Sequence, residues 1–481
     1  MGFTCATCHT GEITQAGNRY LVEGGQANLD MIAFLLALGD AIEANQANSS
    51  KKSRYKSRFF WNTVLQFDWP INPFSGSRYL EKSRVYVRGF TGRNASDVPG
   101  GPARLDAIGS IINELHVHHA NISDDNAVPP VAPVSYPYIW DLSDLQCTQT
   151  NCVSNNPIDR NVGEVLGVFG YMNIEDSWIP NFFQALLGTA GWNLFEATPK
   201  VDNVYKLDRA LAKAHSPKWP DTFPPLDPQL ITLGSQLYTQ HCSSCHIDTT
   251  DGVDGDELTE PNSIGRRFTK VIQMEYSDIG TDPAFAEDFG LRKVNSGLLG
   301  DMLSYSHPDS INPETGIPFG DSFPEEFNSL VLLGVATGAL KKDHYASIGF
   351  IIRTIFTYPE LSWGNAVDAL ITEYAVDQVD GVELLTTSYR AKPLDGIAFT
   401  GPYLHNGSVR TLRDLLKAPE NRPTSFFTGT TEYDLDGAGY MDGGSFYLDT
   451  TIRGNYKEGH IYGTELSDLN KEALLEYLKS L

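Results

Sequence analysis

Two short stretches decide how this chain folds, Cys5-Ala-Thr-Cys8-His9 and Cys242-Ser-Ser-Cys245-His246. They are two copies of the pattern C-x-x-C-H, and they contain four of the six cysteines in the 481-residue chain. With so few Cys and His residues, about 0.002 copies are expected by chance, so the repetition is informative. C-x-x-C-H is the attachment pattern of a c-type haem.

The residue types in this pattern match the shape of a haem. Two thiols add to the two vinyl groups on one edge of the porphyrin, and the imidazole of the next residue then lies beneath the iron. The sequence therefore predicts two covalently bound c-type haems, with His9 and His246 as axial ligands. The attaching thiols are Cys5 and Cys8 at the first motif and Cys242 and Cys245 at the second.

Two other chemistries use related cysteine patterns. A structural zinc site needs a second C-x-x-C or H-x₃₋₅-H arm nearby, and His116, His118 and His119 have the wrong spacing for one. A thioredoxin-like redox pair needs a βαβ context, which neither motif shows. Haem attachment is therefore the favoured interpretation.

The remaining cysteines, Cys147 and Cys152, lie in a short polar loop. They are predicted to form a disulfide, with two free thiols as the alternative. Both this disulfide and c-type haem attachment belong to an oxidising compartment. We therefore expect a periplasmic or secreted protein, although no export signal precedes Cys5 in this chain.

Charge and hydropathy limit the classes of partner. The chain has 36 Lys and Arg against 60 Asp and Glu, a net charge of −24, which argues against binding to nucleic acid or to an anionic membrane surface. The longest apolar run, residues 31–38, is far shorter than the ~20 residues that span a bilayer. We expect neither nucleic-acid binding nor a membrane span.

A helix is predicted to lead directly into the second motif, with Asp227 as its cap and Pro228 in its first turn. The five-proline segment 215–228 before it is the clearest linker. We expect residues 1–214 to form an N-terminal haem lobe with a loop-rich insertion. Because no helix precedes Cys5, this lobe is expected to be truncated at its start, with support of its haem by other segments as the alternative. Residues 229–481 would form a C-terminal cytochrome c-like lobe.

Further helices are predicted at residues 29–45, 53–67, 203–214 and 467–481. Residues 85–165 are rich in Gly, Pro and Asn, and we expect them to be loops that line a cavity. The predicted fold is mainly α-helical, with two cytochrome c-like haem lobes, long loops and a few short strands.

Each motif supplies one axial ligand, so the other axial position decides function. A second protein ligand makes an electron-transfer haem, whereas an open position lets the iron bind O₂ or peroxide. Candidate sixth ligands for the second haem are His460, His405 and Met441. The candidates for the first haem are His116, His118 and His119.

The stretch 389–409, Tyr389-Arg-Ala-Lys-Pro-Leu-Asp-Gly-Ile-Ala-Phe-Thr-Gly-Pro-Tyr-Leu-His405-Asn-Gly-Ser-Val, follows both motifs. Together they resemble the bacterial di-haem cytochrome c peroxidase superfamily. Within it, the chain is most similar to the branch that contains the di-haem rubber oxygenases. The segments that carry this similarity are residues 101–106, 136–140, 160–167 and 459–467.

The resemblance implies two packed lobes whose haems exchange electrons. His9 would hold the reactive haem in the N-terminal lobe, and His246 would hold a six-coordinate electron-transfer haem. His460 is the first choice for its sixth ligand. The peroxidases use a Met after the His405 loop, but the next thirty residues contain none, which keeps His405 and Met441 open.

Four further residues have candidate roles near the reactive haem. Glu164 is predicted to act as a general acid or base on bound peroxide, with a surface carboxylate as the alternative. Trp140 and Phe169 would line an apolar cavity or lie between the redox centres, with core packing as the alternative. Arg160 would balance a haem propionate or form a surface ion pair. The resemblance also implies one inter-haem Ca²⁺, for which no ligands are assigned.

These features predict a haem-dependent oxidoreductase. One hypothesis is a peroxidase that reduces H₂O₂ with electrons from a small redox protein or a small-molecule donor. Another is an O₂-dependent oxygenase that cleaves an apolar alkene. The third is an electron-transfer cytochrome in which both irons are six-coordinate and no catalysis occurs.

Overall fold

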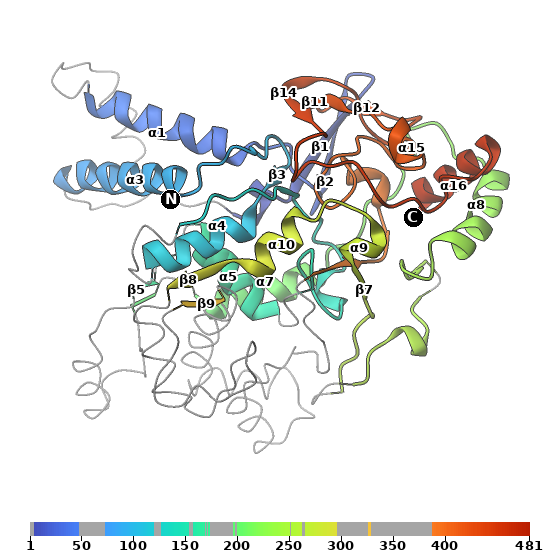
Figure 1. Ribbon diagram of the computed structural model, residues 1–481, viewed down its shortest axis with the longest axis horizontal. Coiled ribbons are helices and arrows are strands. Elements are labelled where there is room, and N and C mark those ends of the chain that lie inside the picture. Colours follow the sequence, from blue (N-terminus) through green and yellow to red (C-terminus); the bar gives the residue numbers. More distant parts are fainter. Residues whose placement is uncertain are drawn as a thin grey trace.

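The computed structural model describes residues 4–47, 73–119, 127–152, 157–168, 170, 172–173, 196–197, 200–250, 252–261, 265–295, 326–328 and 387–481 (Figure 1). The predicted helix at 53–67 lies outside these residues. Within them, no helix combines the length and the apolar character needed to cross a bilayer.

The helices are α1 (Met31–Ala47), α3 (Pro73–Arg93), α4 (Ala107–Asn113), α5 (Pro157–Val168), α7 (Val201–Leu211), α8 (Pro228–His241), α9 (Tyr276–Ile279), α10 (Ala284–Leu291), α15 (Leu412–Leu415) and α16 (Asp468–Ser480). The strands are β1 (Thr10–Gln15), β2 (Asn18–Glu23), β3 (Arg104–Leu105), β4 (Val134–Ser135), β5 (Met172–Asn173), β6 (Glu196–Ala197), β7 (Ile272–Glu275), β8 (Lys293–Asn295), β9 (Glu326–Asn328), β10 (Ser388–Ala391), β11 (Ser425–Gly429), β12 (Tyr433–Asp434), β13 (Gly439–Tyr440) and β14 (Gly444–Asp449).

The strands of this part of the chain form two-stranded antiparallel ladders. The β1–β2 hairpin directly follows the first motif, and it turns at Ala16 and Gly17, which have φ values of 50° and 78°. Strand β10 pairs with β7 across more than a hundred residues of sequence, with Ser388 opposite Glu275. These short ladders position loops rather than form a continuous sheet.

Helices α8 and α16 form the main helix pair near the C-terminus (Figure 1). The side chain of Asp227 accepts a hydrogen bond from the amide of Gln229, and Ser467 caps α16 in the same way. Gly234 allows the close approach, because a Cβ there would lie 2.1 Å from the carbonyl oxygen of Ala473. Both predicted helices are confirmed, including the cap at Asp227.

Helices α1 and α3 lie side by side on the opposite side of the view (Figure 1). Met31 and Leu35 pack against Val87 and Phe90 between them. The predicted helix at 29–45 corresponds to α1, and the one at 203–214 corresponds to α7, which ends three residues earlier.

Residues 85–165 are less irregular than the sequence indicated. They contain the end of α3, all of α4 and much of α5. The apolar side chains of Ile108, Ile111 and Ile112 in α4 are buried, and Gly167 of α5 lies directly against Ile111. Gly and Asn in this segment serve close packing and buried hydrogen bonds, which composition alone does not distinguish from loops.

The largest core joins the two ends of the chain. Ile13 and Val22 of the N-terminal hairpin share it with Leu474 and Leu478 of α16. Phe223 from the 215–228 segment is buried in the same core, although this segment contains no helix or strand before Pro228. The division into residues 1–214 and 229–481 stays a prediction, and the two parts share one core.

Candidate haem sites

The first motif forms a 3₁₀ turn, Cys5–Thr7, immediately before β1. The amide of His9 donates a hydrogen bond of 2.9 Å to the carbonyl of Cys5, so the chain reverses around the two cysteines. The side chain of His9 then donates from Nδ1 to the carbonyl of Pro137, at 2.7 Å. A distant irregular segment therefore holds the imidazole of the first motif.

The second motif repeats this arrangement at the end of α8. The amide of His246 donates to the carbonyl of Cys242 at 2.8 Å, and Tyr238 donates its hydroxyl to the carbonyl of His246 at 2.9 Å. His246 Nδ1 donates to the carbonyl of Lys392, also at 2.7 Å. Two copies of one sequence pattern thus adopt the same side-chain geometry.

This geometry prepares both imidazoles for a metal. A histidine that donates its Nδ1 hydrogen to a carbonyl keeps the lone pair of Nε2 available for coordination. Burial lowers the pKa of both His9 and His246, which favours the neutral form that binds metals. His9 and His246 therefore have the properties expected of the axial ligand that each motif predicts.

His460 faces His246. The centroids of the two rings are 6.4 Å apart, with an angle of 49° between the ring planes. Two imidazoles that bind one metal from opposite sides, each by a bond of about 2.0–2.1 Å, have ring centres roughly 6.3 Å apart. The spacing of His246 and His460 is thus the spacing of two axial ligands on one iron.

Arg422 holds the loop that presents His460. Its guanidinium donates to the carbonyls of Lys457, Gly459 and His460, at 2.7, 2.8 and 2.9 Å. The backbone of His460 has a φ of 48°, an uncommon conformation for a residue with a side chain. His460 Nδ1 is buried and has no hydrogen-bond partner among the described residues, so no group described there competes for this nitrogen.

His246 and His460 line one cavity of about 350 Å³. Cys242 and Cys245 lie on its wall, so the two thiols and two imidazoles of the second site share one space. Aliphatic side chains from the C-terminal part supply much of the remaining surface, namely Leu412, Leu416, Leu474 and Leu478. An apolar wall with a few polar groups suits a planar macrocycle such as a porphyrin.

The other candidate sixth ligands have different surroundings. His405 lines the same cavity, but its ring stacks on Tyr389 at 4.3 Å, and burial, followed by the charge of Arg104, lowers its pKa to about 3. Met441 is 48% exposed. It lines a pocket of about 10 Å³ that includes no residue of either motif.

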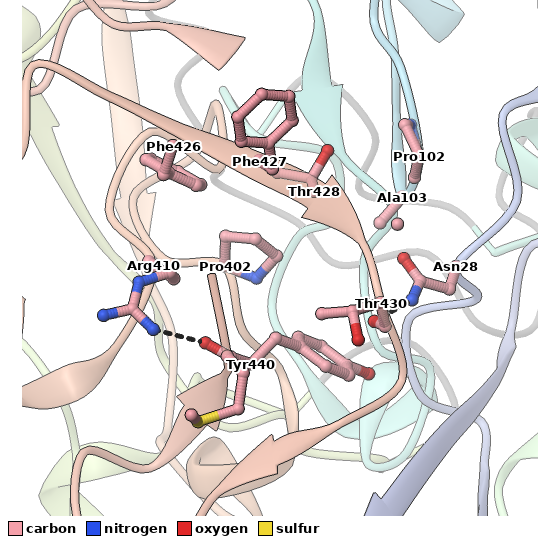
Figure 2. A pocket seen from close by; sticks show the side chains of 12 residues that line it. Asn28, Pro102, Ala103, Pro402, Arg410, Phe426, Phe427, Thr428, Thr430 and Tyr440 are labelled. Carbon is pink, nitrogen blue, oxygen red and sulfur yellow. Dashed lines mark hydrogen bonds between the residues drawn. The ribbon is translucent and has the colours of Figure 1, made fainter. Parts of the chain in front are cut away.

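Figure 2 shows this small pocket, in which Arg410 donates a hydrogen bond of 2.9 Å to the carbonyl of Tyr440. Its volume is about that of a single water molecule. The pocket therefore has no room for a cofactor, and the structure does not bring Met441 to His246.

Glu164 lies within electrostatic range of the first motif. It is on α5, and its Oε1 accepts a hydrogen bond of 3.0 Å from Gln149. Burial raises the pKa of Cys8 to about 11, and the charge of Glu164 adds to that shift. The structure thus brings Glu164 toward the first motif, which is a condition for acting as a general acid or base at the first haem.

Arg160 and Trp140 are both buried, so the ion pair of Arg160 is not at the surface. Arg160 pairs with Asp208 at 3.2 Å, and its Nη1 has no partner among the described residues. Trp140 donates to the carbonyl of Asp395 at 2.9 Å and stacks on Tyr138, with ring centroids 4.5 Å apart. Phe169 and the side chains of His116, His118 and His119 lie outside the described residues.

Sequence reasoning missed Tyr138, Lys392 and Arg422. The hydroxyl of Tyr138 donates to the carbonyl of Pro393 at 2.6 Å, and Lys392 Nζ lies 3.1 Å from the centre of the Tyr138 ring. Tyr138 and Lys392 lie in segments that the resemblance singled out. However, the resemblance said nothing of backbone carbonyls or ring contacts, so no available signal identified their roles.

The predicted disulfide between Cys147 and Cys152 is present. The part of the chain that the structure describes contains no group of three or more His, Cys, Asp or Glu residues arranged to hold a metal ion. No ligands for the expected Ca²⁺ are therefore identified there.

Comparison with known proteins identifies a cytochrome c-like segment. Residues 388–427 match the family described as RoxA-like, cytochrome c-like. This segment contains β10, Lys392 and the His405 loop, and it implies a c-type haem in this chain. The chain is thus a haem-containing protein with a cytochrome c-like segment.

Two relatives come from Sinorhizobium fredii (strain NBRC 101917 / NGR234). The uncharacterized protein y4iJ is 30% identical over 509 aligned residues, which cover 100% of this chain and 77% of y4iJ. The uncharacterized protein y4iM is 47% identical over 53 residues, which cover 11% of this chain and 12% of y4iM. This chain belongs to the same family as y4iJ.

Proposed function

We propose that this chain is an exported di-haem c-type cytochrome that acts as a haem-dependent oxidoreductase. In this proposal, an electron-transfer haem at the second motif exchanges electrons with a reactive haem at the first motif. Each haem belongs to one cytochrome c-like lobe. The observation that carries the proposal is the 6.4 Å spacing of His246 and His460. This spacing supports a second haem whose iron has two histidine axial ligands, and therefore a role of that haem in electron transfer.

The first motif supports the reactive site. When bound there, haem supplies an iron that can bind and reduce O₂ or peroxide. Glu164 is the candidate group for moving a proton, since Gln149 holds its Oε1 and leaves the carboxyl group positioned near the motif. A positioned general acid or base contributes typically about 10²–10⁴-fold to a rate.

The environment of His9 supports the same assignment. The hydrogen bond to Pro137 fixes its orientation, and burial keeps the imidazole neutral. Arg160, paired with Asp208, adds a buried cation whose charge acts on His9. We infer that His9 and Arg160 hold and orient the first haem, and that Glu164 transfers the proton.

The reaction would be the activation of peroxide or O₂. A cytochrome c peroxidase-like reaction would take electrons from a small redox protein or a small-molecule donor. The RoxA-like match of residues 388–427 favours a second candidate, an O₂-dependent oxygenase that cleaves an apolar alkene. The disulfide between Cys147 and Cys152 supports a periplasmic or secreted location for either reaction.

Electron paramagnetic resonance of the resting protein tests the proposal, together with a pyridine haemochrome assay. We expect two haems per chain, one low-spin with two histidine ligands and one with an exchangeable position that binds cyanide. Fewer than two haems would contradict the proposal. Two low-spin haems that bind neither cyanide nor CO would make the protein an electron-transfer cytochrome instead.

Substrate assays then separate the two reactions. Turnover of peroxide with a reduced cytochrome would support the peroxidase-like reaction. Consumption of O₂ with a polyisoprene chain, without added electrons, would support the oxygenase.

A further inference from the structure

The cavity at the second motif is lined by cations without carboxylates. Arg390 and Lys392 are on its wall, and no Asp or Glu is among the residues that line it. The whole chain, by contrast, has 60 Asp and Glu and a net charge of −24. A positively charged cavity in so acidic a protein indicates a site for an anionic ligand.

Both cations come from one extended segment. Arg390 is in β10, and Lys392 follows that strand directly. Residues two apart in an extended chain project to the same side. Arg390 Nη1 donates to the carbonyl of Cys147 at 2.7 Å, so this end of the guanidinium is anchored next to the disulfide.

Two like charges in an apolar cavity are costly. Arg390 and Lys392 are close enough for their charges to repel each other. Burial lowers the pKa of Arg390 to about 10. A buried charge is tolerated when an opposite charge pairs with it. The lining of this cavity includes no carboxylate, and the carboxylate whose charge acts on Lys392 is that of Asp141, outside the lining.

Lys392 also lies between the two motifs. Its backbone carbonyl accepts the hydrogen bond from His246, and its ammonium group contacts the ring of Tyr138, the residue after Pro137. The carbonyl of Pro137 in turn accepts the hydrogen bond from His9, so Lys392 contacts the segments that hold both imidazoles. An anion bound here would share the cavity of the second motif with Cys242, Cys245 and His246.

We propose that Arg390 and Lys392 form a carboxylate-binding site that holds the propionate groups of the haem in this cavity. The inference rests on the proposed function, since it requires a haem at the second motif. The thiols of Cys242 and Cys245 would hold the vinyl edge of the porphyrin, while the cations would hold its carboxylate edge. A macrocycle clamped at both edges has one orientation relative to His246 and His460.

The test uses the two-haem protein and its variants Lys392→Met and Arg390→Met. Lys392→Arg keeps the charge, and Lys270→Met is the matched control, because Lys270 Nζ donates to the carbonyl of Asp256 at 2.7 Å and Lys270 does not line the cavity. Each protein is analysed by resonance Raman spectroscopy of the propionate bending bands and by spectroelectrochemical titration of both haems.

We expect Lys392→Met to shift a propionate band and to lower one midpoint potential. The expected decrease in midpoint potential is about 59 mV, which for a one-electron couple corresponds to a tenfold change in the ratio of oxidised to reduced haem. Lys392→Arg should restore the potential, and Lys270→Met should change neither quantity. Should Lys392→Met fail to retain two haems, Arg390→Met and Lys392→Arg still report on the propionate band.

Three results would overturn the inference. The first is an unchanged Raman spectrum and unchanged potentials in both methionine variants with two haems present. The second is a shift of the same size in Lys270→Met. The third is a saturable Soret shift when sodium decanoate is added to the original protein, lost in Lys392→Met, because the site would then bind an external carboxylate. A failure of the proposed function is distinct, since it appears as fewer than two haems in the original protein.

Discussion

The hydroxyl of Tyr138 donates a hydrogen bond of 2.6 Å to the carbonyl of Pro393. Tyr138 follows Pro137, whose carbonyl holds His9, and Pro393 follows Lys392, whose carbonyl holds His246. Three hydrogen bonds therefore connect the imidazoles of the two motifs, by way of the Tyr138 side chain and the backbone of residues 137–138 and 392–393. This is a continuous bonded route between segments that are far apart in the sequence.

Tyr138→Phe should slow electron exchange between the two haems, because it removes the middle hydrogen bond of this route. It should also lower the free energy of unfolding by about 1–3 kcal/mol, since the carbonyl of Pro393 loses its buried partner. Flash photolysis of the CO-bound, half-reduced protein measures the exchange rate.

Tyr136→Phe is the matched control, because the hydroxyl of Tyr136 donates to the carbonyl of Leu29 at 3.1 Å, outside the route. It should have a similar effect on stability and none on the exchange rate. Equal rates in the two variants would show that the Tyr138 hydroxyl does not contribute to the exchange.

His460→Ala should convert the second haem from low spin to high spin, because the ring opposite His246 is removed. Two haems should still be attached, since the thiols of Cys242 and Cys245 are unchanged. Electron paramagnetic resonance measures the spin state, and added imidazole should restore the low-spin signal.

His241→Ala is the control for this variant. His241 is in the same region but pairs with Glu465 at 3.5 Å, and its loss should leave both spin states unchanged. A low-spin second haem in His460→Ala would mean that another residue, such as His405, is the sixth ligand.

Glu164→Gln should lower turnover by about 10²-fold or more if the carboxyl group transfers a proton at the first haem. The amide keeps the size of the side chain but does not exchange a proton, so haem content and spin states should not change. Steady-state rates with peroxide or O₂ measure the effect. Glu12→Gln, at a half-buried carboxylate that pairs with Arg19, should retain full activity.

Replacing both Cys242 and Cys245 with serine should remove one haem and much of the order around α8 and α16. The cavity of about 350 Å³ would lose the apolar ligand that fills it. The haemochrome assay and circular dichroism measure the two effects. Normal folding of this variant with two haems attached would contradict the assignment of the second motif.

Replacing Cys147 and Cys152 with serine is the matched change at the other cysteine pair. Both haems should remain attached, and the free energy of unfolding should fall by about 2 kcal/mol, the value expected for opening so short a loop. Denaturant unfolding measures the change.

Gly234→Ala should destabilise the contact between α8 and α16, because the added methyl group would lie 2.1 Å from the carbonyl oxygen of Ala473. Gly92→Ala in α3 is the control, since no atom lies within 4 Å of its added methyl group. Alanine should stabilise that helix by about 0.5–1 kcal/mol, whereas the change at Gly234 should lower the melting temperature.

The local features of the chain were predictable from sequence. The two C-x-x-C-H motifs, the cap at Asp227, the helix that ends at the second motif and the short-loop disulfide all depend on residues close together in the chain. Residue type and spacing determine such features directly. Residues 107–113 and 157–165 were wrongly expected to be loops, because their helices depend on packing between Ile111 and Gly167.

The sequence by itself predicted two sites of haem attachment and determined which imidazole follows each pair of thiols. It gave His405, His460 and Met441 as candidate sixth ligands of the second haem, but it did not show which of them is the ligand. Only the tertiary structure brought the ring of His460 to 6.4 Å from that of His246 and left Met441 at a different pocket. It also decided that carbonyls of Pro137 and Lys392 orient the two histidines. The physical reason is that covalent attachment is a local property, whereas opposition of two rings depends on loops that are folded together across more than two hundred residues.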